Sequence, residues 1–393
     1  MKPKSTRIES IDILRGVIMV IMALDHVRSY FHYGSFFTNP TNLETTTPIL
    51  FFTRFITHYC APVFVFLAGT SAFLYGTKKS KPQLFKFLFT RGIWLIFLEV
   101  VVNNLIWTFD LTYSFLILQV IWTIGICMVC LSFLIYLPKQ IILTIGILLV
   151  AGHNAMDGVV LEGQSLQSVI WYIFHQGKLF VLSPNSIIFI HYPLIPWIGL
   201  MALGYLFGTL YQKDFEVGLR KKWLFYLGVG TILLFFGLRG LNVYGDLVPW
   251  THQETTSKTI ISFFNVTKYP PSLLYLCITI GPSLLFLYTI ETTKNEVTNF
   301  FLVFGRVPLF YYFLHVLVIH VFAIVGILIF GGEWKNMILD AQSFINQNLL
   351  IYGYSLLVVY AIWIGIILLL YPICKKYMNY KTNNKSKWWL SYL

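Results

Sequence analysis

Long apolar segments constrain this chain more than any other feature. Hydrophobic residues make up 57% of the 393 residues and charged residues only 11%, whereas an ordinary soluble domain carries about 25% charged residues. A helix of about 20 mostly apolar residues can cross a bilayer. Such segments lie near 11–32, 49–75, 87–109, 113–137, 140–156, 187–211, 222–240, 270–290, 305–330 and 349–374. We therefore expect an all-α integral membrane protein, a polytopic bundle of about ten transmembrane helices.

The positions of lysine and arginine predict how this bundle is oriented. Loops on the cytoplasmic side of a membrane are enriched in these residues. If the N-terminus is cytoplasmic, the outer segments hold only Lys178, Lys258, Lys268 and Lys335. Because the predicted number of spans is even, we then expect the C-terminus on the cytoplasmic side as well. The net charge of +12 is accounted for by membrane orientation, and we expect the lipid bilayer and no nucleic acid as a partner.

The chain reads as one domain. We expect a single transmembrane domain over 1–380 and a short basic cytoplasmic tail over 381–393. The stretch 157–186 is predicted to form a short extra or re-entrant helix. Long outer loops could cover a site open to the outside. Nothing in the sequence sets the oligomeric state.

The cysteines do not predict a metal site. All five lie in apolar stretches, and Cys127 and Cys130 are three residues apart. No second pair and no nearby histidine completes a zinc-binding set. We interpret the cysteines as packing residues and expect no bound metal.

The first apolar segment carries ionisable residues that are costly in lipid. A charge at the centre of a membrane helix costs about 3 kcal/mol, so it usually faces a protein interior or a cavity. Arg15 and His26 are eleven residues apart, which places them on one helix face with their backbones about 16 Å apart. This face could line a tunnel that holds a long anionic ligand with its reactive end at His26. Alternatively, Arg15 pairs with Asp12 and His26 bonds to a neighbouring helix.

The next two segments add further polar candidates. Arg54 and His58 are four residues apart and share a helix face, so His58 is a second candidate base or a packing histidine. Glu99 lies in the third segment with Asn103 one turn on. A buried carboxylate is protonated or paired. We interpret Glu99 mainly as an organiser of charge, and the expected partners are Arg15, Arg54 or Arg239.

Polar residues also recur toward the outer ends of later segments, where we predict a polar cavity. Together with Arg54, Glu99 and Asn103, the residues expected to bind an acceptor substrate are His191, Arg239, Asp246, Lys268 and His315. At the inner surface, the loop GTKKSKPQ offers Lys78, Lys79 and Lys81. These lysines could bind the phosphate groups of a ligand. Alternatively, they are ordinary lysines of a cytoplasmic loop with no role in binding.

Several of these motifs resemble a known family. Arg15, ten intervening residues and His26 resemble the signature of membrane acyltransferases that O-acetylate surface polysaccharides. The run RIESIDILRGVIMVIMALDHV is similar to the start of heparan-alpha-glucosaminide N-acetyltransferase and its bacterial relatives. The likeness continues over most of the chain, through TRFITHYCAPVFVFLAGTSAFLYG, TRGIWLIFLE, HYPLIPWIGLMALGY, NVTKYPPSLL and FGRVPLFYYFLH.

The resemblance implies an enzyme of the bacterial inner membrane and cell envelope. It would move an acetyl or other short acyl group from cytoplasmic acetyl-CoA to an extracytoplasmic sugar, glycan or small molecule. The implied catalytic residues are His26, Asp25, Arg15 and His58, and the implied acetyl-CoA-binding residues are Arg15, Lys78, Lys79 and Lys81. In the glucosaminide enzyme the position of Asp25 is an amide and the key histidine lies in the following outer loop. The base therefore stays open among His26, His58 and His32.

Two other classes of protein use similar residues. A proton-coupled transporter also needs buried histidine, glutamate and arginine, but it favours inverted repeats and broken midplane helices, which are not clear in this sequence. A non-catalytic scaffold for envelope assembly would function without His26. Acyl transfer needs a base, an aligned donor and an oxyanion contact. Candidates for that contact are Arg54, Arg239 and Asn103. We favour direct transfer, with an acyl-histidine intermediate as the alternative.

Overall fold

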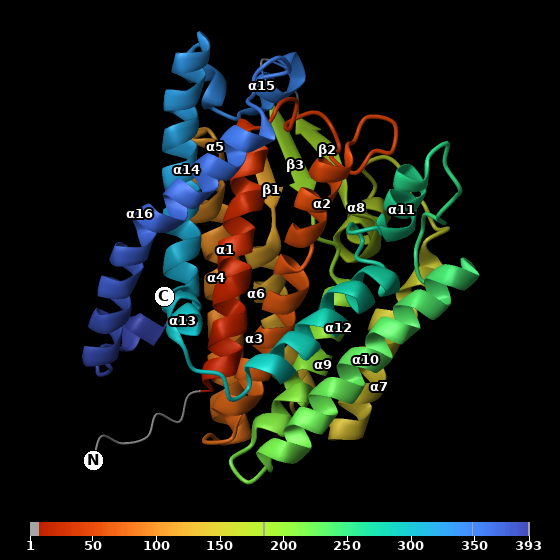
Figure 1. Cartoon of the computed structure of the whole chain (residues 1–393), viewed down its shortest axis with the longest axis vertical. Coiled ribbons are helices and arrows are strands. Elements are labelled where there is room, and N and C mark those ends of the chain that lie inside the picture. The colour runs from red at the N-terminus through yellow and green to blue at the C-terminus, as the bar shows by residue number, and fades with distance from the viewer. Residues whose placement is uncertain (1–7, 184, 348, 392–393) are drawn as a thin grey trace.

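The computed structural model describes residues 8–183, 185–347 and 349–391, and helices dominate it (Figure 1). The α-helices are α1 (Glu9–Phe31), α2 (Pro48–Thr57), α3 (Cys60–Gly76), α4 (Lys81–Phe97), α5 (Asn104–Thr108), α6 (Val120–Leu134), α7 (Lys139–Ala151), α8 (Leu166–Trp171), α9 (Ile195–Phe207), α10 (Val217–Leu241), α11 (Thr256–Phe264), α12 (Leu273–Ile290), α13 (Glu296–Arg306), α14 (Pro308–Phe330), α15 (Ala341–Asn346) and α16 (Leu356–Asn383). Single turns of 3₁₀- or π-helix are η1 (Leu98–Asn103), η2 (His153–Met156), η3 (Tyr172–Gln176), η4 (Gly208–Tyr211), η5 (Trp334–Met337) and η6 (Trp388–Ser391).

The helices make this a multi-pass membrane protein. Each of the ten predicted segments overlaps a helix. The helices that are long and apolar enough to span a membrane are Pro48–Gly76, which joins α2 and α3, together with α10, α12, α14 and α16. Three further apolar helical stretches are shorter: α6, α7 and Ile195–Tyr211. Ten crossings and cytoplasmic termini therefore remain predictions.

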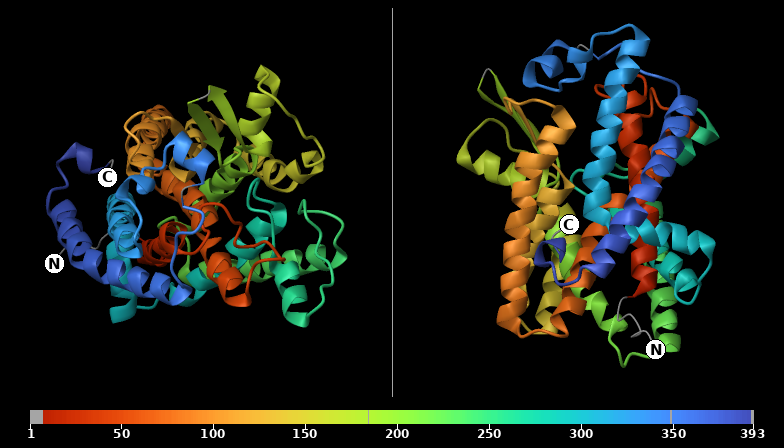
Figure 2. Two further views of the ribbon diagram at one scale, coloured as in Figure 1. Left: turned by 90° about the horizontal axis from the view of Figure 1, so that it is seen from above. Right: turned by 90° about the vertical axis from the view of Figure 1, so that its left-hand side faces the viewer.

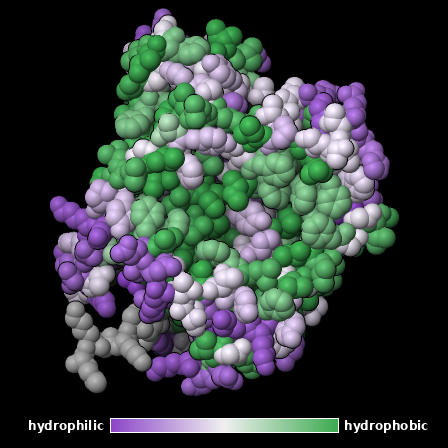
Figure 3. Space-filling view, in the orientation of Figure 1, coloured by the Kyte–Doolittle hydropathy of each residue, from purple (hydrophilic) through white to green (hydrophobic). Residues whose placement is uncertain are grey.

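The two ends of the bundle differ in charge. The loop 77–81, which carries three lysines, gathers with the loops 212–216 and 291–295, which carry one lysine each, at the end where α1 begins, which we call the lower end (Figure 1). Hydrophilic residues are dense there, and apolar residues cover much of the middle of the molecule (Figure 3). The opposite, upper end carries the strands and α15 (Figure 1). The lower end is thus the one that the sequence predicts to be cytoplasmic.

A small sheet at the upper end departs from the expected all-α fold. Strands β1 (Phe115–Leu118), β2 (Lys178–Ser183) and β3 (Ser186–Ile190) lie in the order β1-β3-β2. β1 runs parallel to β3, and β2 runs antiparallel to it. The segments predicted to be helical from 113 and 187 therefore begin as strands, because a short apolar run does not distinguish strand from helix. Within the stretch 157–186, α8 and η3 form the short extra helix that the sequence offered, and β2 follows them.

Close contacts between glycines hold the long helices together. A Cβ atom on Gly16 would overlap the Phe301 carbonyl, and one on Gly305 would overlap the Asp12 carbonyl, so α1 and α13 touch through their backbones. In lipid, small residues at such contacts replace the hydrophobic driving force that joins helices in water. Facing pairs also join α3 to α9 (Gly69, Gly204), α4 to α6 (Gly92, Gly125), α7 to α9 (Gly146, Gly199) and α10 to α12 (Gly228, Gly281).

Helix α1 occupies the interior of this bundle. It contacts α2, α3, α12, α13, α14 and α16. Seen from above, α1 lies inside the bundle and α16 passes along its outside (Figure 2). The ionisable side chains of α1 therefore face protein and not lipid.

We expect Gly305→Ala to destabilise the protein. The added methyl group would meet the Asp12 carbonyl, which belongs to a packed helix backbone, and overpacking of this kind costs about 1–3 kcal/mol. Gly230→Ala in α10 is the matched control, because a Cβ atom there meets nothing within 4 Å. Thermal unfolding in detergent should show a lower midpoint for Gly305→Ala only. Equal midpoints for the two variants would contradict the proposed contact.

Candidate active site

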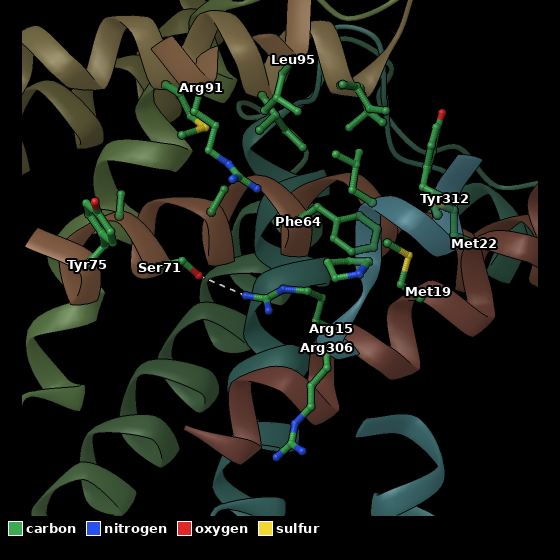
Figure 4. A pocket seen from close by; sticks show the side chains of 18 of the residues that line it. Arg15, Met19, Met22, Phe64, Ser71, Tyr75, Arg91, Leu95, Arg306 and Tyr312 are labelled. Atoms are coloured by element: carbon green, nitrogen blue, oxygen red, sulfur yellow. Dashed lines mark hydrogen bonds between the residues drawn. The ribbon is translucent and has the colours of Figure 1, made fainter. Parts of the chain in front are cut away.

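A cavity of about 390 Å³ lies between α1, α3, α4, α6 and α14. Figure 4 shows Tyr75, Ser71, Arg91 and the guanidinium of Arg15 toward one end and Met22 and Tyr312 toward the other. The basic residues that line the cavity are Arg15, Arg91, Arg306 and Lys381. The cavity therefore suits a ligand that is anionic at one end and apolar further in.

Arg15 is fixed in the wall of this cavity. Its guanidinium forms an ion pair with Asp12 at 2.9 Å and donates to Ser71 Oγ at 3.1 Å. A weaker contact of 3.4 Å reaches the Gly305 carbonyl. The pairing with Asp12 that the sequence offered as an alternative is confirmed, and the same side chain also lines the cavity. One arginine thus joins α1, α3 and α13 beside the ligand space.

His26 lies next to the end of the cavity that Met22 and Tyr312 line. It follows Met22 by one helical turn, and its ring stands edge-to-face with those of Tyr312 and Trp107, at centroid distances of 5.9 and 4.9 Å. The side chain is 9% exposed. His26 is not one of the residues that line the cavity, so the cavity does not join Arg15 to His26 as the sequence predicted; Tyr312, which lines the cavity, contacts the His26 ring.

A second histidine sets the orientation of His26. Nδ1 of His26 lies 2.8 Å from Nε2 of His315, and Nδ1 of His315 lies 2.7 Å from the Tyr311 carbonyl oxygen. The carbonyl only accepts, so His315 carries its proton on Nδ1. When both rings are neutral, His315 accepts through Nε2 and His26 donates through Nδ1. Nε2 of His26 then keeps its lone pair, as a general base held by a second group requires.

Glu99 organises the wall beside this pair. The carboxylate is completely buried and accepts hydrogen bonds from Asn103 Nδ2 at 2.8 Å. It also accepts from the backbone N–H groups of Gln119 and Trp122, where the start of α6 favours negative charge. The role of organiser fits this geometry. The expected arginine partner is not found among the residues that the structure describes.

Tyr312 has a hydroxyl proton to donate. Its oxygen accepts from Asn103 Nδ2 and Trp107 Nε1, each at 3.4 Å, and its own O–H has no acceptor among the residues that the structure describes. The sequence analysis missed this residue because an aromatic residue in an apolar run normally indicates packing. Its spacing of three from His315 is the one signal that could have identified it.

A charged cluster, the outer cluster, lies on the other side of His26. Asp25 forms ion pairs with Arg54 at 2.5 Å and with Arg28 at 3.0 Å. Lys268 is 9% exposed and interacts electrostatically with both Asp25 and His26. Its ammonium lies 5.1 Å from the Tyr269 ring. The cluster thus brings three cations (Arg28, Arg54 and Lys268) to one carboxylate.

The remaining candidate histidines are His58, His191 and His32. His58 is 2% exposed at the break between α2 and α3, and its ring packs on Tyr275 and Phe55. This placement fits its alternative role in packing. The His191 ring lies 3.9 Å from that of Tyr269. His32 lies at the end of α1, and its Nδ1 is 3.1 Å from the Tyr354 carbonyl oxygen.

Arg239 and Asp246, which the sequence predicts to bind the acceptor substrate, stabilise the loops above the outer cluster. Arg239 is almost completely buried and donates to backbone carbonyl groups, those of Phe263, Val248, Ser262 and Asn265. Asp246 accepts from the backbone and hydroxyl of Thr267 and from the Ser272 hydroxyl. Lys268 lies between Thr267 and Ser272 in the chain. Asp246 therefore fixes the conformation of the segment that carries Lys268. Neither side chain contacts His26.

The lysines predicted to bind a cofactor lie outside the cavity. Lys78, Lys79 and Lys81 are exposed in and beside the loop between α3 and α4, and none of them lines the cavity. Lys79 lies over the ring of Tyr75, a lining residue, at 6.0 Å. The cavity takes its positive charge from α1, α4, α13 and α16 instead. The sequence analysis missed Arg91 and Lys381 because the order of the helices does not show which of their faces converge.

The structure thus combines a multi-pass helical bundle with a buried histidine pair beside a cation-lined cavity. Residues 7–248 match the family model of the heparan-alpha-glucosaminide N-acetyltransferase catalytic domain. This match covers more than half of the chain, and the protein therefore belongs to that acyltransferase family. It includes Arg15, Asp25, His26 and Arg54, whereas Lys268 and α14 lie beyond it. No curated protein matches the chain.

Proposed function

We propose that the protein transfers an acetyl or other short acyl group from cytoplasmic acyl-CoA to an extracytoplasmic acceptor, a sugar or glycan. The observation that carries this proposal is the cavity lined by cations at one end and by Tyr312 at the other, against the His26–His315 pair. The family supports acyl transfer. The donor, the acceptor and the direction of transfer are proposed from the family resemblance together with the charges of the site.

The cavity would hold the acyl donor. Arg15, Arg91, Arg306 and Lys381 would bind the phosphates of coenzyme A through charge-assisted hydrogen bonds. The backbones of Arg15 and His26 are about 16 Å apart along α1, which leaves room for an extended chain between the charged groups and the thioester. Met19 and Met22 would contact the apolar part of that chain.

The outer cluster would hold the acceptor. Its cations outnumber its carboxylate, so the cluster favours an acceptor that carries a negative charge near the group to be acylated. Arg54 and Lys268 would contact that charge, and the ring of His191 would support Tyr269 beside it. Donor and acceptor would then meet at His26 from opposite sides of the membrane.

The transfer step follows from the hydrogen bonds at His26. The acceptor O–H or N–H gives its proton to Nε2 of His26 as its oxygen or nitrogen attacks the thioester carbonyl carbon. The Tyr312 hydroxyl donates to the oxyanion that forms. The carbon–sulfur bond then breaks, and the His26 imidazolium returns the proton to the departing thiolate. His315 keeps the His26 ring in place throughout.

Loss of His26 should abolish the reaction. We expect His26→Ala to lower the release of free coenzyme A from acetyl-CoA about 10²–10⁴-fold, as removal of a general base does. The assay uses purified full-length protein with a glycan acceptor mixture. His32→Ala and His58→Ala are the matched variants and should retain most of the activity. Release that is absent in wild type, or equal in all four proteins, would exclude the proposed enzyme and favour a transporter or scaffold.

Tyr312→Phe tests the oxyanion contact. We expect kcat to fall about 10²–10³-fold, the usual cost of removing one oxyanion donor, with little change in the KM for acetyl-CoA. Tyr311→Phe is the matched control, since Tyr311 is the preceding residue and its buried hydroxyl has no hydrogen-bond partner among the described residues. A kcat for Tyr312→Phe equal to that of the control would refute the assignment.

Arg91→Ala tests the donor site. The loss of one charge-assisted contact to phosphate should weaken acetyl-CoA binding about tenfold, a change of ~1.4 kcal/mol. Lys78→Ala, at an exposed basic residue outside the cavity, should bind acetyl-CoA nearly as well as wild type. Calorimetric titration of both variants measures the difference. A larger effect at Lys78 than at Arg91 would place the coenzyme in the lysine loop instead.

A further inference from the structure

A cluster of metal-binding side chains lies apart from the proposed active site. His153 in η2, Asp157 just after it and His175 in η3 each offer one ligand atom, and these atoms all lie within 4.8 Å of one another. The two histidines are 1% and 2% exposed. Two separate turns of the chain thus direct three ligand groups at one buried point.

The polar atoms of this cluster are poorly satisfied by the protein itself. Both ring nitrogens of His153, both of His175 and Oδ1 of Asp157 are buried and make no hydrogen bond within the described residues. Nε2 of His175 lies 3.2 Å from Oδ1 of Asp157, but the two groups are not aligned as a hydrogen bond. The Pro271 carbonyl faces the His153 ring, also outside hydrogen-bond geometry. Unpaired buried polar groups are costly, which indicates that something else binds here.

We propose that His153, Asp157 and His175 bind a zinc ion, with water at the fourth position. Two imidazoles and one carboxylate are ligands that zinc takes, at bonds of about 2.0–2.2 Å in a tetrahedral arrangement. Ligand atoms in such a site lie about 3.4 Å apart, so small side-chain rotations would bring all three onto one ion. Imidazole ligands disfavour Mg²⁺ and Ca²⁺.

The surroundings of the cluster fit a metal site. Nδ2 of Asn154 donates to Oδ2 of Asp157 at 2.8 Å, which orients the carboxylate and leaves Oδ1 toward the histidines. Groups that orient ligands in this way are typical of bound metals. The ring of Trp171 packs on His175 at 4.8 Å, and its indole N–H bonds to the Val159 carbonyl. The loop is therefore held in place around the ligands.

The position of the cluster gives the ion a structural role. Asn154 Oδ1 accepts from the backbone N–H of Leu273 at 3.0 Å, which ties the cluster to the start of α12. Lys268 lies five residues before that point. A zinc ion here would brace the loop between α7 and β2 against the segment that presents Lys268. The expectation of no metal, based on the cysteines, would then be wrong because the ligands come from histidine and aspartate in separate turns.

Zinc content tests this proposal without reference to activity. The full-length protein, purified in detergent without a histidine tag, should hold about one zinc ion per chain by elemental analysis. Removal of the ion by a chelator should lower the thermal midpoint, and added Zn²⁺ should restore it. Asp157→Asn keeps the shape of the side chain and should lower zinc affinity at least about tenfold. His252→Ala, at an exposed histidine that does not belong to the cluster, should bind zinc as wild type does.

The spectrum of Co²⁺ bound in place of zinc provides a second measurement. Wild type should show the absorption bands of a nitrogen- and oxygen-ligated ion, and His175→Ala should lose them. Both variants are compared in the monodisperse fraction from size exclusion, so that only folded protein is counted. A wild-type protein purified without zinc, equal zinc affinity in wild type and Asp157→Asn, or no effect of the chelator on the wild-type midpoint would overturn the proposal and leave a metal-free histidine–aspartate cluster.

Discussion

The backbone contact between α1 and α13 is the interaction on which the site depends. Gly16 and Gly305 let the two helices touch without side chains between them, and this contact places Arg306 at the end of α13 near Arg15 on α1. Helix α14 begins two residues after Arg306, so the same contact sets the height of Tyr312 and His315 against His26. In lipid no hydrophobic force would hold these helices at that distance, and only the close fit of small residues does.

Helix α1 separates two kinds of charge along its length. Below His26 the charges line a cavity, and Arg15 is fixed there by Asp12 and Ser71. Above His26 the charges form a packed cluster around Asp25. The imidazole lies between them with Nδ1 bonded to His315. Under the proposed function, a donor in the cavity and an acceptor at the outer cluster would approach His26 from these two sides.

Several polar residues support the site from its surroundings. Glu99 holds Asn103, and Asn103 in turn contacts the Tyr312 hydroxyl. Asp246 and Arg239 organise the loops that lead to Lys268. Buried polar groups need partners, and here most of those partners are backbone groups. This explains why polar residues that look alike in the sequence divide into those that bind loops together and those that face the ligand space.

The sequence by itself determined the class of the protein, the approximate positions of ten helical segments and the importance of α1. Apolar length and the cost of charge in lipid depend only on local composition, and a spacing of eleven places Arg15 and His26 on one face whatever surrounds the helix. The pairing of Arg15 with Asp12 was predictable for the same reason.

Only the tertiary structure decided which residues meet across helices. The bond between His26 and His315 joins residues 289 positions apart, and the cavity takes Arg91 and Lys381 from helices that no local pattern brings together. The small sheet was hidden because four or five apolar residues fit strand and helix equally well. Contacts of this kind depend on where glycines allow helices to approach, and that is a property of the packed bundle and not of any single segment.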